Sequence, residues 1–453
     1  MTFSFKIFGC RLNQAEGANW ISQFEDAGFE RVPFDFEADI ILLYSCTVTQ
    51  KAENECLKTL RHLRVTQPKA FIVFAGCAVE TCDRATLADV VNLFINRDQK
   101  EEMVRLVGEK CGKQTCAEDE HPGAKSERSF EASGAGARSG IPRWSGNAGM
   151  REFGNSGMGE KRVPRLLTQR ATLKVQDGCD FRCAYCIVPH ARGEPRSRPL
   201  SECLAEARAY CEAGFQEIVI TGCNTACYVD EGLNLIDLLQ AVLTVPRLGR
   251  LRLGSIEPGT VEGELIALMA HEPRVCRFLH LPIQSGSDSI LKSMKRRYTI
   301  STIRQRLAEA FSTLPDLAVG TDLIAGFPGE TLDDFEQTCQ LLRDYPFANA
   351  HVFPYSERPG TPAATMAQQV SVAERKRRAK VLSDIAEQQR VTYMNRFLGR
   401  EVTLLVERVD RTGCGTGWSA EYLPCVVHGL TASARKTLQT FTVRSIDKGV
   451  LVG

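Results

Sequence analysis

The sequence predicts an α/β protein with three folded regions: an N-terminal α/β domain with a parallel sheet, a partial (β/α)6 barrel and a small C-terminal β-barrel. Three observations lead to this prediction. Short apolar runs alternate with helical patterns over residues 1–110 and again over residues 166–394. Short strand patterns separated by Gly-containing turns fill residues 395–453. Residues 111–165 are rich in Gly, Ser, Ala and charge and have no periodicity, which predicts a flexible linker.

In the N-terminal region, three apolar runs predict buried parallel strands: "FSFKIFGC", "DIILLYSC" and "AFIVFAGC". The helical patterns "AEGANWISQFEDAGF" and "KAENECLKTLRHLR" separate them. Each run ends in a cysteine, at Cys10, Cys46 and Cys77. Ligands of open α/β sheets bind at the carboxyl ends of the strands, so we expect these three thiols to converge.

The second region contains six strand patterns, and helical patterns or turns follow them: "ATLKVQDGC", "EIVITGCN", "LRLGSIEP", "FLHLPIQSGS", "VGTDLIAGF" and "AHVFPYS". Such units form a barrel whose chemistry gathers at the C-terminal strand ends. The expected strand ends carry Cys179, Asn224, Glu257, Gln284, Asp322 and Tyr355. One polar or ligating group on every strand indicates a common site. Cys223 and Cys227 fall on the same rim, and we interpret them as small packing residues.

The C-terminal region has the strand and turn pattern of a small β-barrel. Such barrels commonly bind nucleic acid and stack bases on aromatic side chains. Trp418 and Tyr422 are the aromatic residues that we expect to bind RNA here.

Composition narrows the class of protein. The chain has 453 residues, 43% hydrophobic, and its 56 basic and 55 acidic residues give a formal charge of +1. That balance neither indicates nor excludes a nucleic-acid partner. No signal peptide is recognisable and no apolar run reaches the roughly 18 to 20 residues of a membrane span, so we expect a cytoplasmic protein with no membrane partner. The 18 cysteines then indicate metal binding or catalysis rather than disulfides.

The segment "GCDFRCAYC" carries Cys179, Cys183 and Cys186 in the spacing CxxxCxxC. Structural zinc and ordinary cubane iron–sulfur clusters take four protein ligands. Either a fourth ligand comes from elsewhere, as in a zinc loop, or one iron is left open for another molecule. The barrel context favours the open iron.

This three-cysteine segment, closing the first barrel strand, resembles the radical S-adenosylmethionine superfamily, and Tyr185 fits the aromatic position of its signature. The resemblance implies a 4Fe–4S cluster on three thiolates, whose open iron binds S-adenosylmethionine. The reduced cluster splits that cofactor to a deoxyadenosyl radical. With the three N-terminal cysteines, nearly the whole chain resembles the methylthiotransferase family. That family has an N-terminal cluster domain, a radical barrel and a C-terminal TRAM domain.

Carried over onto this sequence, the resemblance implies that Cys10, Cys46 and Cys77 hold a second 4Fe–4S cluster, which carries the sulfur to be inserted. It also implies that polar groups of the barrel line the S-adenosylmethionine pocket, namely Tyr185, Asn224, Glu257, Gln284 and Asp322. Buried structural cysteines and strand-end caps are the plainer interpretations of these residues.

The segments "GCRLNQAE", "CTVTQKAE" and "IVPHARGEPRSR" resemble the branch that acts on threonylcarbamoyladenosine at tRNA position 37. The resemblance therefore implies methylthio transfer to carbon 2 of that base, with tRNA, an electron donor of the flavodoxin or ferredoxin class and a sulfur source as partners. Two alternatives keep the chemistry but change the substrate, to isopentenyladenosine in tRNA or to a ribosomal-protein aspartate. A non-enzymatic alternative is an RNA-binding protein with zinc in both cysteine sets.

Two basic runs are candidates for phosphate contacts: "MKRRYT", with Lys295–Arg297, and "ERKRRAK", with Arg375–Arg378. The plainer interpretation of each is a solvated helix face.

Overall fold

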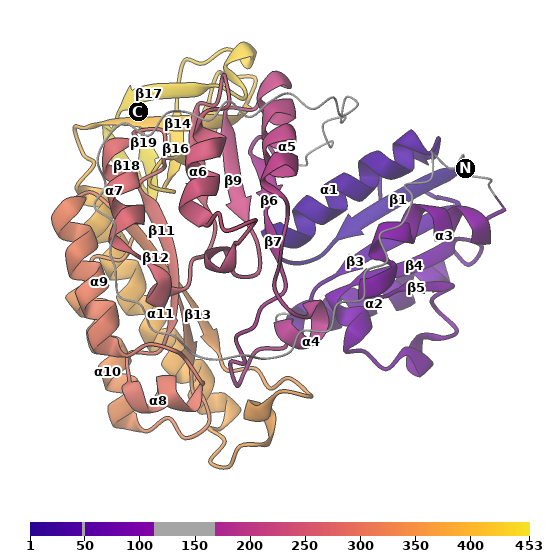
Figure 1. The fold of residues 1–453 in the computed structure, drawn as a ribbon, viewed down its shortest axis with the longest axis horizontal. Helices are drawn as coiled ribbons and strands as arrows, with labels where there is room; N and C mark the ends of the chain where they lie inside the picture. The colour runs from indigo at the N-terminus through magenta and orange to yellow at the C-terminus, as the bar shows by residue number, and fades with distance from the viewer. Residues whose placement is uncertain (48–49, 113–167) are drawn as a thin grey trace.

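The computed structural model describes residues 1–47, 50–112 and 168–453, and its helices and strands follow the α/β order expected from the sequence (Figure 1). Apart from its first two residues, the predicted linker 111–165 lies outside the described residues. Within the part of the chain that the structure describes, no helix combines the length and the apolar character that crossing a membrane requires.

The N-terminal unit is a five-stranded parallel sheet in the order β2-β1-β3-β4-β5. Its elements are β1 (Thr2–Ile7), α1 (Arg11–Asp26), β2 (Glu30–Arg31), β3 (Ile40–Ser45), α2 (Gln50–Thr66), β4 (Phe71–Gly76), β5 (Leu93–Ile95) and α3 (Met103–Lys110). The three strands expected from the sequence are the adjacent central strands, so their carboxyl ends share one edge. The edge strands β2 and β5 were not expected, because two or three residues carry no readable periodicity.

The second unit is the expected partial barrel. Its six strands form two three-stranded parallel sheets, β10-β9-β6 and β11-β12-β13. A parallel bridge between Ser255 and His280 joins the two sheets into one curved wall. The strands are β6 (Ala171–Lys174), β9 (Glu217–Thr221), β10 (Arg250–Leu253), β11 (Phe278–Gln284), β12 (Ala318–Ala325) and β13 (Asn349–Pro354). A two-stranded ribbon of β7 (Gln176–Asp177) and β8 (Arg196–Ser197) lies beside them.

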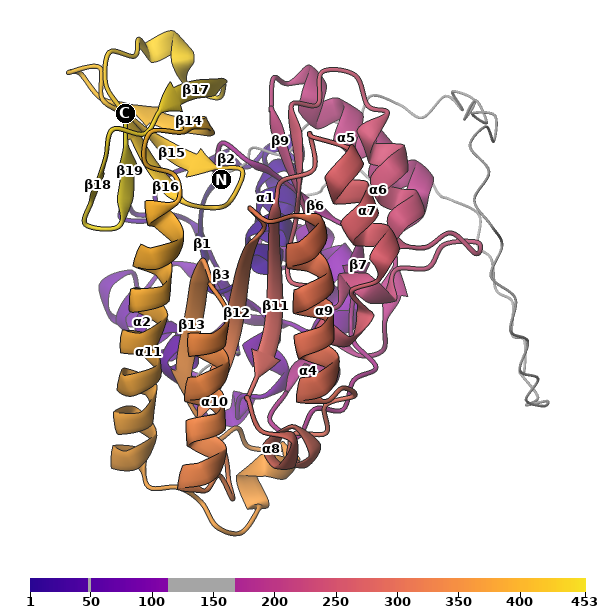
Figure 2. The ribbon, with the colours of Figure 1, turned by 90° about the vertical axis from the view of Figure 1, so that its left-hand side faces the viewer.

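Helices cover the outer face of this wall (Figure 2), and their apolar sides join the strands in the largest core of the molecule. They are α5 (Leu200–Glu212), α6 (Leu235–Leu243), α7 (Gly263–His271), α8 (Asp288–Ser293), α9 (Ile300–Thr313), α10 (Leu332–Asp344) and α11 (Val372–Asn395).

The C-terminal unit is a mixed six-stranded sheet in the order β17-β14-β15-β16-β19-β18. Its strands are β14 (Glu401–Val409), β15 (Gly415–Ser419), β16 (Pro424–Val427), β17 (Leu438–Thr442), β18 (Ser445–Asp447) and β19 (Val450–Val452). Its apolar face shares a core with Phe278 and Ala318 of the barrel and with Tyr393 at the end of α11. The unit is therefore packed against the barrel through a continuous hydrophobic contact.

A buried ion-pair network strengthens this junction. Glu217 on β9 is fully buried and accepts from Arg250 Nε at 2.5 Å and from Arg252 Nε at 2.8 Å. The two guanidiniums also donate to main-chain carbonyls of the C-terminal sheet, including that of Ser419 at 2.8 Å. Burial alone would raise the pKa of Glu217, but Arg252 and Arg250 outweigh it and lower the pKa to about 2. Glu217 therefore holds both arginines in the geometry that clamps the C-terminal sheet.

Replacing Glu217 with Gln should lower the free energy of unfolding at pH 7 by about 3 to 5 kcal/mol, because two buried guanidiniums lose their carboxylate. Because folding lowers the pKa of Glu217, its carboxylate stabilises the fold at pH values above the ordinary carboxyl pKa of 4.5. This stability is lost as the pH falls toward 2. The wild type should therefore lose stability over that window more steeply than the variant. Denaturant unfolding at neutral and acidic pH measures both effects.

The control is Glu336→Gln, which removes an exposed ion pair with Arg343 and should change stability by less than about 1 kcal/mol. The same acid sensitivity in wild type and Glu217→Gln would contradict the role given to Glu217.

Candidate active site with two cysteine triads

The loop between β7 and α4 (Val188–Arg192) carries three cysteines that we call the barrel triad: Cys179, Cys183 and Cys186. Gly178 opens the loop with a φ of 72°, and a Cβ there would lie 2.0 Å from the carbonyl oxygen of Glu194. Only glycine fits such a close approach. The Cys179 amide donates to Gly193 O at 3.0 Å, so the loop curls back on its own end.

Burial sets the protonation of these thiols. Cys183 is buried and the other two are half-buried. Burial raises the pKa of Cys179, and it raises that of Cys186 to about 12. Thiols in this environment lose their protons when they bind a cationic metal centre, because the metal binds the thiolate form.

The donor set of the barrel triad fits an iron–sulfur cluster. Cysteine thiolates are the usual protein ligands of such clusters, and in a cubane each protein sulfur binds a different iron. Among the described residues, no three His, Cys, Asp or Glu side chains converge on a single metal position.

Arg296 connects the barrel triad to the rim of the barrel. Its side chain is only 5% exposed, and it donates to Glu257 Oε2 at 2.8 Å and to the Tyr185 hydroxyl at 3.3 Å. Its Nη1 also lies 3.4 Å from Cys183 Sγ. Two of the expected pocket residues, Tyr185 and Glu257, are thus brought directly beside the triad.

Buried oxygen atoms without partners also face this region. Among the described residues, Glu257 Oε1, Asn224 Oδ1 and the Tyr355 hydroxyl have no hydrogen-bond partner. Burial raises the pKa of Glu257 even though Arg296 opposes the shift. Asn224 Nδ2 donates to Cys227 Sγ at 3.1 Å, and that thiol lies 3.8 Å from Asp180 of the triad loop. Buried acceptors left open in this way suit a ligand that brings donors.

Gln284 and Asp322 have different environments. Gln284 ends β11, is buried, and adopts a φ of 74°, which is unusual for a residue other than glycine. Asp322 lies inside β12, which continues to Ala325, so the expected strand end at Asp322 is wrong. Its carboxylate lies 3.1 Å from His280 Nε2 on the neighbouring strand. Asp322 therefore lies within its strand, beside His280, rather than at the strand end.

The other three cysteines form what we call the N-terminal triad: Cys10, Cys46 and Cys77. They follow the adjacent strands β1, β3 and β4, as expected. Cys46 and Cys77 are buried, while Cys10 is exposed at the start of α1. A Cβ on Gly9 would lie 2.7 Å from Cys46 Sγ, so the Cys10 loop passes directly over Cys46. This triad has the same donor chemistry as the barrel triad.

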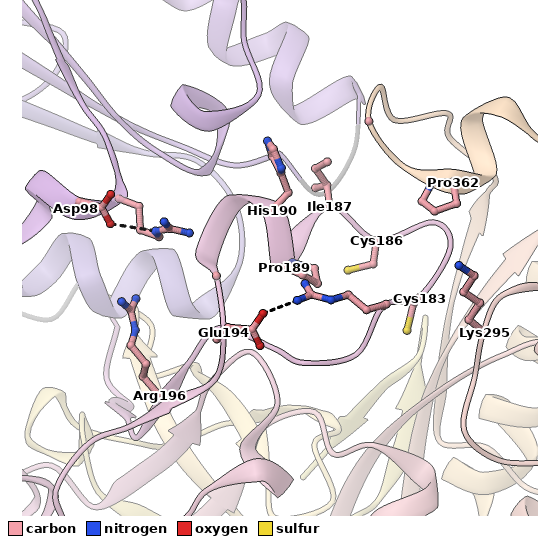
Figure 3. A pocket seen from close by; sticks show the side chains of 14 residues that line it. Asp98, Cys183, Cys186, Ile187, Pro189, His190, Glu194, Arg196, Lys295 and Pro362 are labelled. Atoms are coloured by element: carbon pink, nitrogen blue, oxygen red, sulfur yellow. Dashed lines mark hydrogen bonds and ion pairs between the residues drawn. The ribbon is translucent and has the colours of Figure 1, made fainter. Parts of the chain in front are cut away.

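Cys183 and Cys186 line a pocket of about 600 Å³ between the barrel and the N-terminal unit (Figure 3). The wall on the N-terminal side carries Arg97 and Asp98. Four Arg or Lys side chains line the pocket against two carboxylates. The pocket therefore opens beside the barrel triad with an excess of positive charge, which suits an anionic partner.

The aromatic residues expected to bind RNA lie together at the junction of all three units. The rings of Trp418 and Tyr422 stack with centroids 4.7 Å apart. Arg11 of α1 donates to the Tyr422 hydroxyl and lies over its ring. Arg252 of β10 also lies over that ring. Both rings are half-buried, so the stacking surface is already shared with cations of the chain.

The basic runs are not simply solvated faces. Arg296 is buried beside the triad, and Arg375 and Arg378 are each about 5% exposed. Arg378 pairs with buried Glu330 at 2.7 Å. The solvated interpretation is wrong for these three residues. Their burial was not predicted, because it depends on carboxylates that lie 18 to 48 residues away in the chain. Arg378 additionally pairs with Glu374, one helical turn away.

Comparison with known proteins adds family information. A model of the radical SAM superfamily matches residues 173–342, and a model of the uncharacterized family UPF0004 matches residues 2–95. A threonylcarbamoyladenosine tRNA methylthiotransferase of Thermotoga maritima is 32% identical, covering 99% of this chain and 96% of its own. An enzyme of the same description from Bacillus subtilis is 30% identical, covering 94% and 90%. A tRNA-2-methylthio-N6-dimethylallyladenosine synthase of Desulfitobacterium hafniense is 31% identical, covering 88% and 85%.

Among solved structures, a radical S-adenosylmethionine methyltransferase of Kitasatospora setae superposes with a TM-score of 0.52 at 14% identity, covering 80% of this chain and 73% of its own. A cobalamin-dependent S-adenosylmethionine radical enzyme gives a TM-score of 0.51 at 14% identity, covering 85% and 56%. At these identities the likeness concerns the fold.

Proposed function

The chain belongs to the methylthiotransferase family of radical S-adenosylmethionine enzymes, and from this premise we propose that it adds a methylthio group to carbon 2 of N6-threonylcarbamoyladenosine at tRNA position 37. The observation that carries the proposal is the pair of cysteine triads on facing units of one chain. One triad fits a radical generator and the other a sulfur carrier. Near full-length relatives described as acting on threonylcarbamoyladenosine support the choice of substrate.

In this proposal Cys179, Cys183 and Cys186 hold three irons of a 4Fe–4S cluster, and Cys10, Cys46 and Cys77 hold a second cluster. When bound, the first cluster supplies the electron that cleaves the sulfonium of S-adenosylmethionine. The protein contributes the thiolates, of which those of Cys46, Cys77 and Cys183 are buried, and the alignment of cofactor and substrate.

The S-adenosylmethionine pocket is proposed at the rim beside the barrel triad. The unpartnered oxygens of Glu257 and Asn224 can accept hydrogen bonds from an ammonium group or from ribose hydroxyls. Arg296 holds the other Glu257 oxygen and the Tyr185 hydroxyl in place. Gln284 and Asp322 are proposed to line the deeper, inner side of the same pocket.

Transfer RNA is the proposed macromolecular partner. The positive pocket beside the barrel triad would face its phosphates or the carboxylate of the threonylcarbamoyl group. Trp418 and Tyr422 are proposed to contribute to RNA binding through the exposed parts of their rings. We further propose an electron donor of the flavodoxin or ferredoxin class, a sulfur source and a cytoplasmic location, since each serves this reaction.

Relatives described as dimethylallyladenosine synthases match at a similar identity, which makes isopentenyladenosine in tRNA the second candidate substrate. Nucleoside analysis of tRNA from a strain lacking the gene distinguishes the two. The methylthio form of threonylcarbamoyladenosine should disappear and its unmethylthiolated form should accumulate. Wild-type protein should restore the product, while Cys183→Ala should not. Loss of the methylthio isopentenyl nucleoside instead would replace the proposed substrate with the second candidate.

A further inference from the structure

A buried guanidinium lies between the two cysteine triads. Arg192 ends helix α4 within the segment "IVPHARGEPRSR", and its side chain is 3% exposed. One terminal nitrogen, Nη2, donates to Asn13 Oδ1 of the N-terminal unit at 2.7 Å. The other, Nη1, donates to Asp177 Oδ1 of the barrel at 3.0 Å. Arg192 therefore spans the two units with one planar group.

On the N-terminal side, Asn13 is tied to the ends of two triad strands. It is fully buried, and its Nδ2 donates to Phe8 O at 2.9 Å and to Ser45 O at 2.8 Å. Ser45 directly precedes Cys46. The thiol of Cys10 lies 3.7 Å from the same Asn13 oxygen that accepts from Arg192. A displacement of Asn13 would thus move the loops that carry two of the three thiols.

On the barrel side, Asp177 is tied to the start of the triad loop. Its Oδ1, the atom that accepts from Arg192, also accepts from the Gly178 amide at 2.9 Å. Cys179 is the next residue in the chain. The other carboxylate oxygen accepts from Lys174 Nζ at 2.8 Å. The position of Asp177 therefore determines where the barrel triad begins.

The buried charge of Arg192 is balanced by carboxylates of both units. Glu16 of α1 accepts from Arg192 Nη2 at 3.0 Å and from Lys174 Nζ at 2.6 Å. The Tyr44 hydroxyl also donates to Glu16 at 2.5 Å. Lys100 Nζ also lies 3.7 Å from Glu16 Oε1, so the two carboxylates face three cations. A buried network of this kind, with its members hydrogen-bonded to one another, permits few alternative geometries.

We propose that Asn13, Arg192 and Asp177 are positioning residues that set the separation and orientation of the two cysteine triads. This inference rests on the proposed function, in which the substrate carbon must reach both triads during one turnover. Misplacing reacting groups by about 1 Å can cost roughly 100-fold in rate. A planar arginine fork fixes two acceptors at a defined spacing, whereas the single ammonium of a lysine does not.

The test is Arg192→Lys in full-length protein with both clusters reconstituted. The positive charge is kept for Glu16, so we expect the iron content and the spectrum of each separate cluster to stay as in the wild type. The magnetic interaction between the two reduced clusters, measured by electron paramagnetic resonance, should change because it depends steeply on their separation. The ratio of methylthio product to deoxyadenosine should fall at least about tenfold. Asn13→Ser, which shortens the bridge from the other side, should change both quantities in the same direction.

The matched control is Arg378→Lys, since Arg378 is a similarly buried arginine paired with Glu330 away from both triads. It should leave the magnetic interaction and the product ratio unchanged. Wild-type values of both quantities in Arg192→Lys and Asn13→Ser would overturn the inference and leave the proposed function intact. Loss of iron or of deoxyadenosine in both variants would overturn it in favour of a purely structural role. Absence of methylthio product from the wild type would instead contradict the proposed function.

Discussion

Replacing Cys179, Cys183 and Cys186 with Ala should reduce the iron content from about eight to about four atoms per chain and should abolish deoxyadenosine formation. The expectation follows from the geometry of the barrel triad, whose loop holds Cys183 beside Arg296, the residue that also binds the Glu257 carboxylate. No other part of the described chain offers that combination of thiols and buried open acceptors. Iron analysis and chromatography of the cleaved cofactor measure the two effects.

The control for this variant is a triple replacement of three other barrel cysteines with Ala: Cys203, Cys211 and Cys339. These thiols are buried in helices α5 and α10, so their loss tests the general cost of removing sulfur from the barrel core. Iron content and cofactor cleavage should stay at the wild-type level. Cofactor cleavage by the Cys179, Cys183 and Cys186 variant would remove the radical generator from this loop.

Replacing Cys10, Cys46 and Cys77 with Ala should abolish the methylthio product while deoxyadenosine is still formed. The N-terminal triad lies on a separate sheet, and the loop of the barrel triad is built by its own contacts with Gly193 and Glu194. About four irons should remain, all on the barrel triad. Measuring both products in one reaction mixture shows whether cofactor cleavage has been uncoupled from transfer.

Cys56→Ala is the matched control for the N-terminal unit. Cys56 is fully buried on α2 in the same unit, but it does not follow a strand of the sheet. Its replacement should retain both clusters and both products. If the N-terminal triple variant folds and yet loses deoxyadenosine as well, the three cysteines serve the structure rather than sulfur transfer.

The two triple variants should lose different sets of products. The barrel variant loses both products because cofactor cleavage comes first. The N-terminal variant loses only the later one. A protein in which both triads were structural zinc sites would show neither pattern.

The order of the elements and the places of the six cysteines could be predicted from local sequence patterns. Cys10, Cys46 and Cys77 each follow a run of apolar residues, and a parallel strand buried on both faces is recognisable from such a run alone. The CxxxCxxC spacing lies within one loop. Both signals are local, because strand periodicity and loop spacing are properties of consecutive residues.

Which charged residues are buried, and which units they join, could be seen only in the folded chain. Arg296, Arg375 and Arg378 lie in runs typical of a solvated face, yet each is buried against a carboxylate or carbonyl 14 to 48 residues away in the sequence. Asp322 was expected at a strand end, but β12 extends beyond it because its main chain pairs with β13 as far as Pro354.

The junction of the barrel with the C-terminal unit and its junction with the N-terminal unit have the same physical origin. Glu217 meets Arg250 and Arg252 across adjacent strands, and Arg192 meets Asn13 across 179 positions of the chain. A buried charge is stable only beside its partner, and the partner is chosen by how the sheets pack rather than by neighbouring residues. The sequence therefore reveals the thiols, whereas the spacing between the two triads depends on contacts that only the folded chain creates.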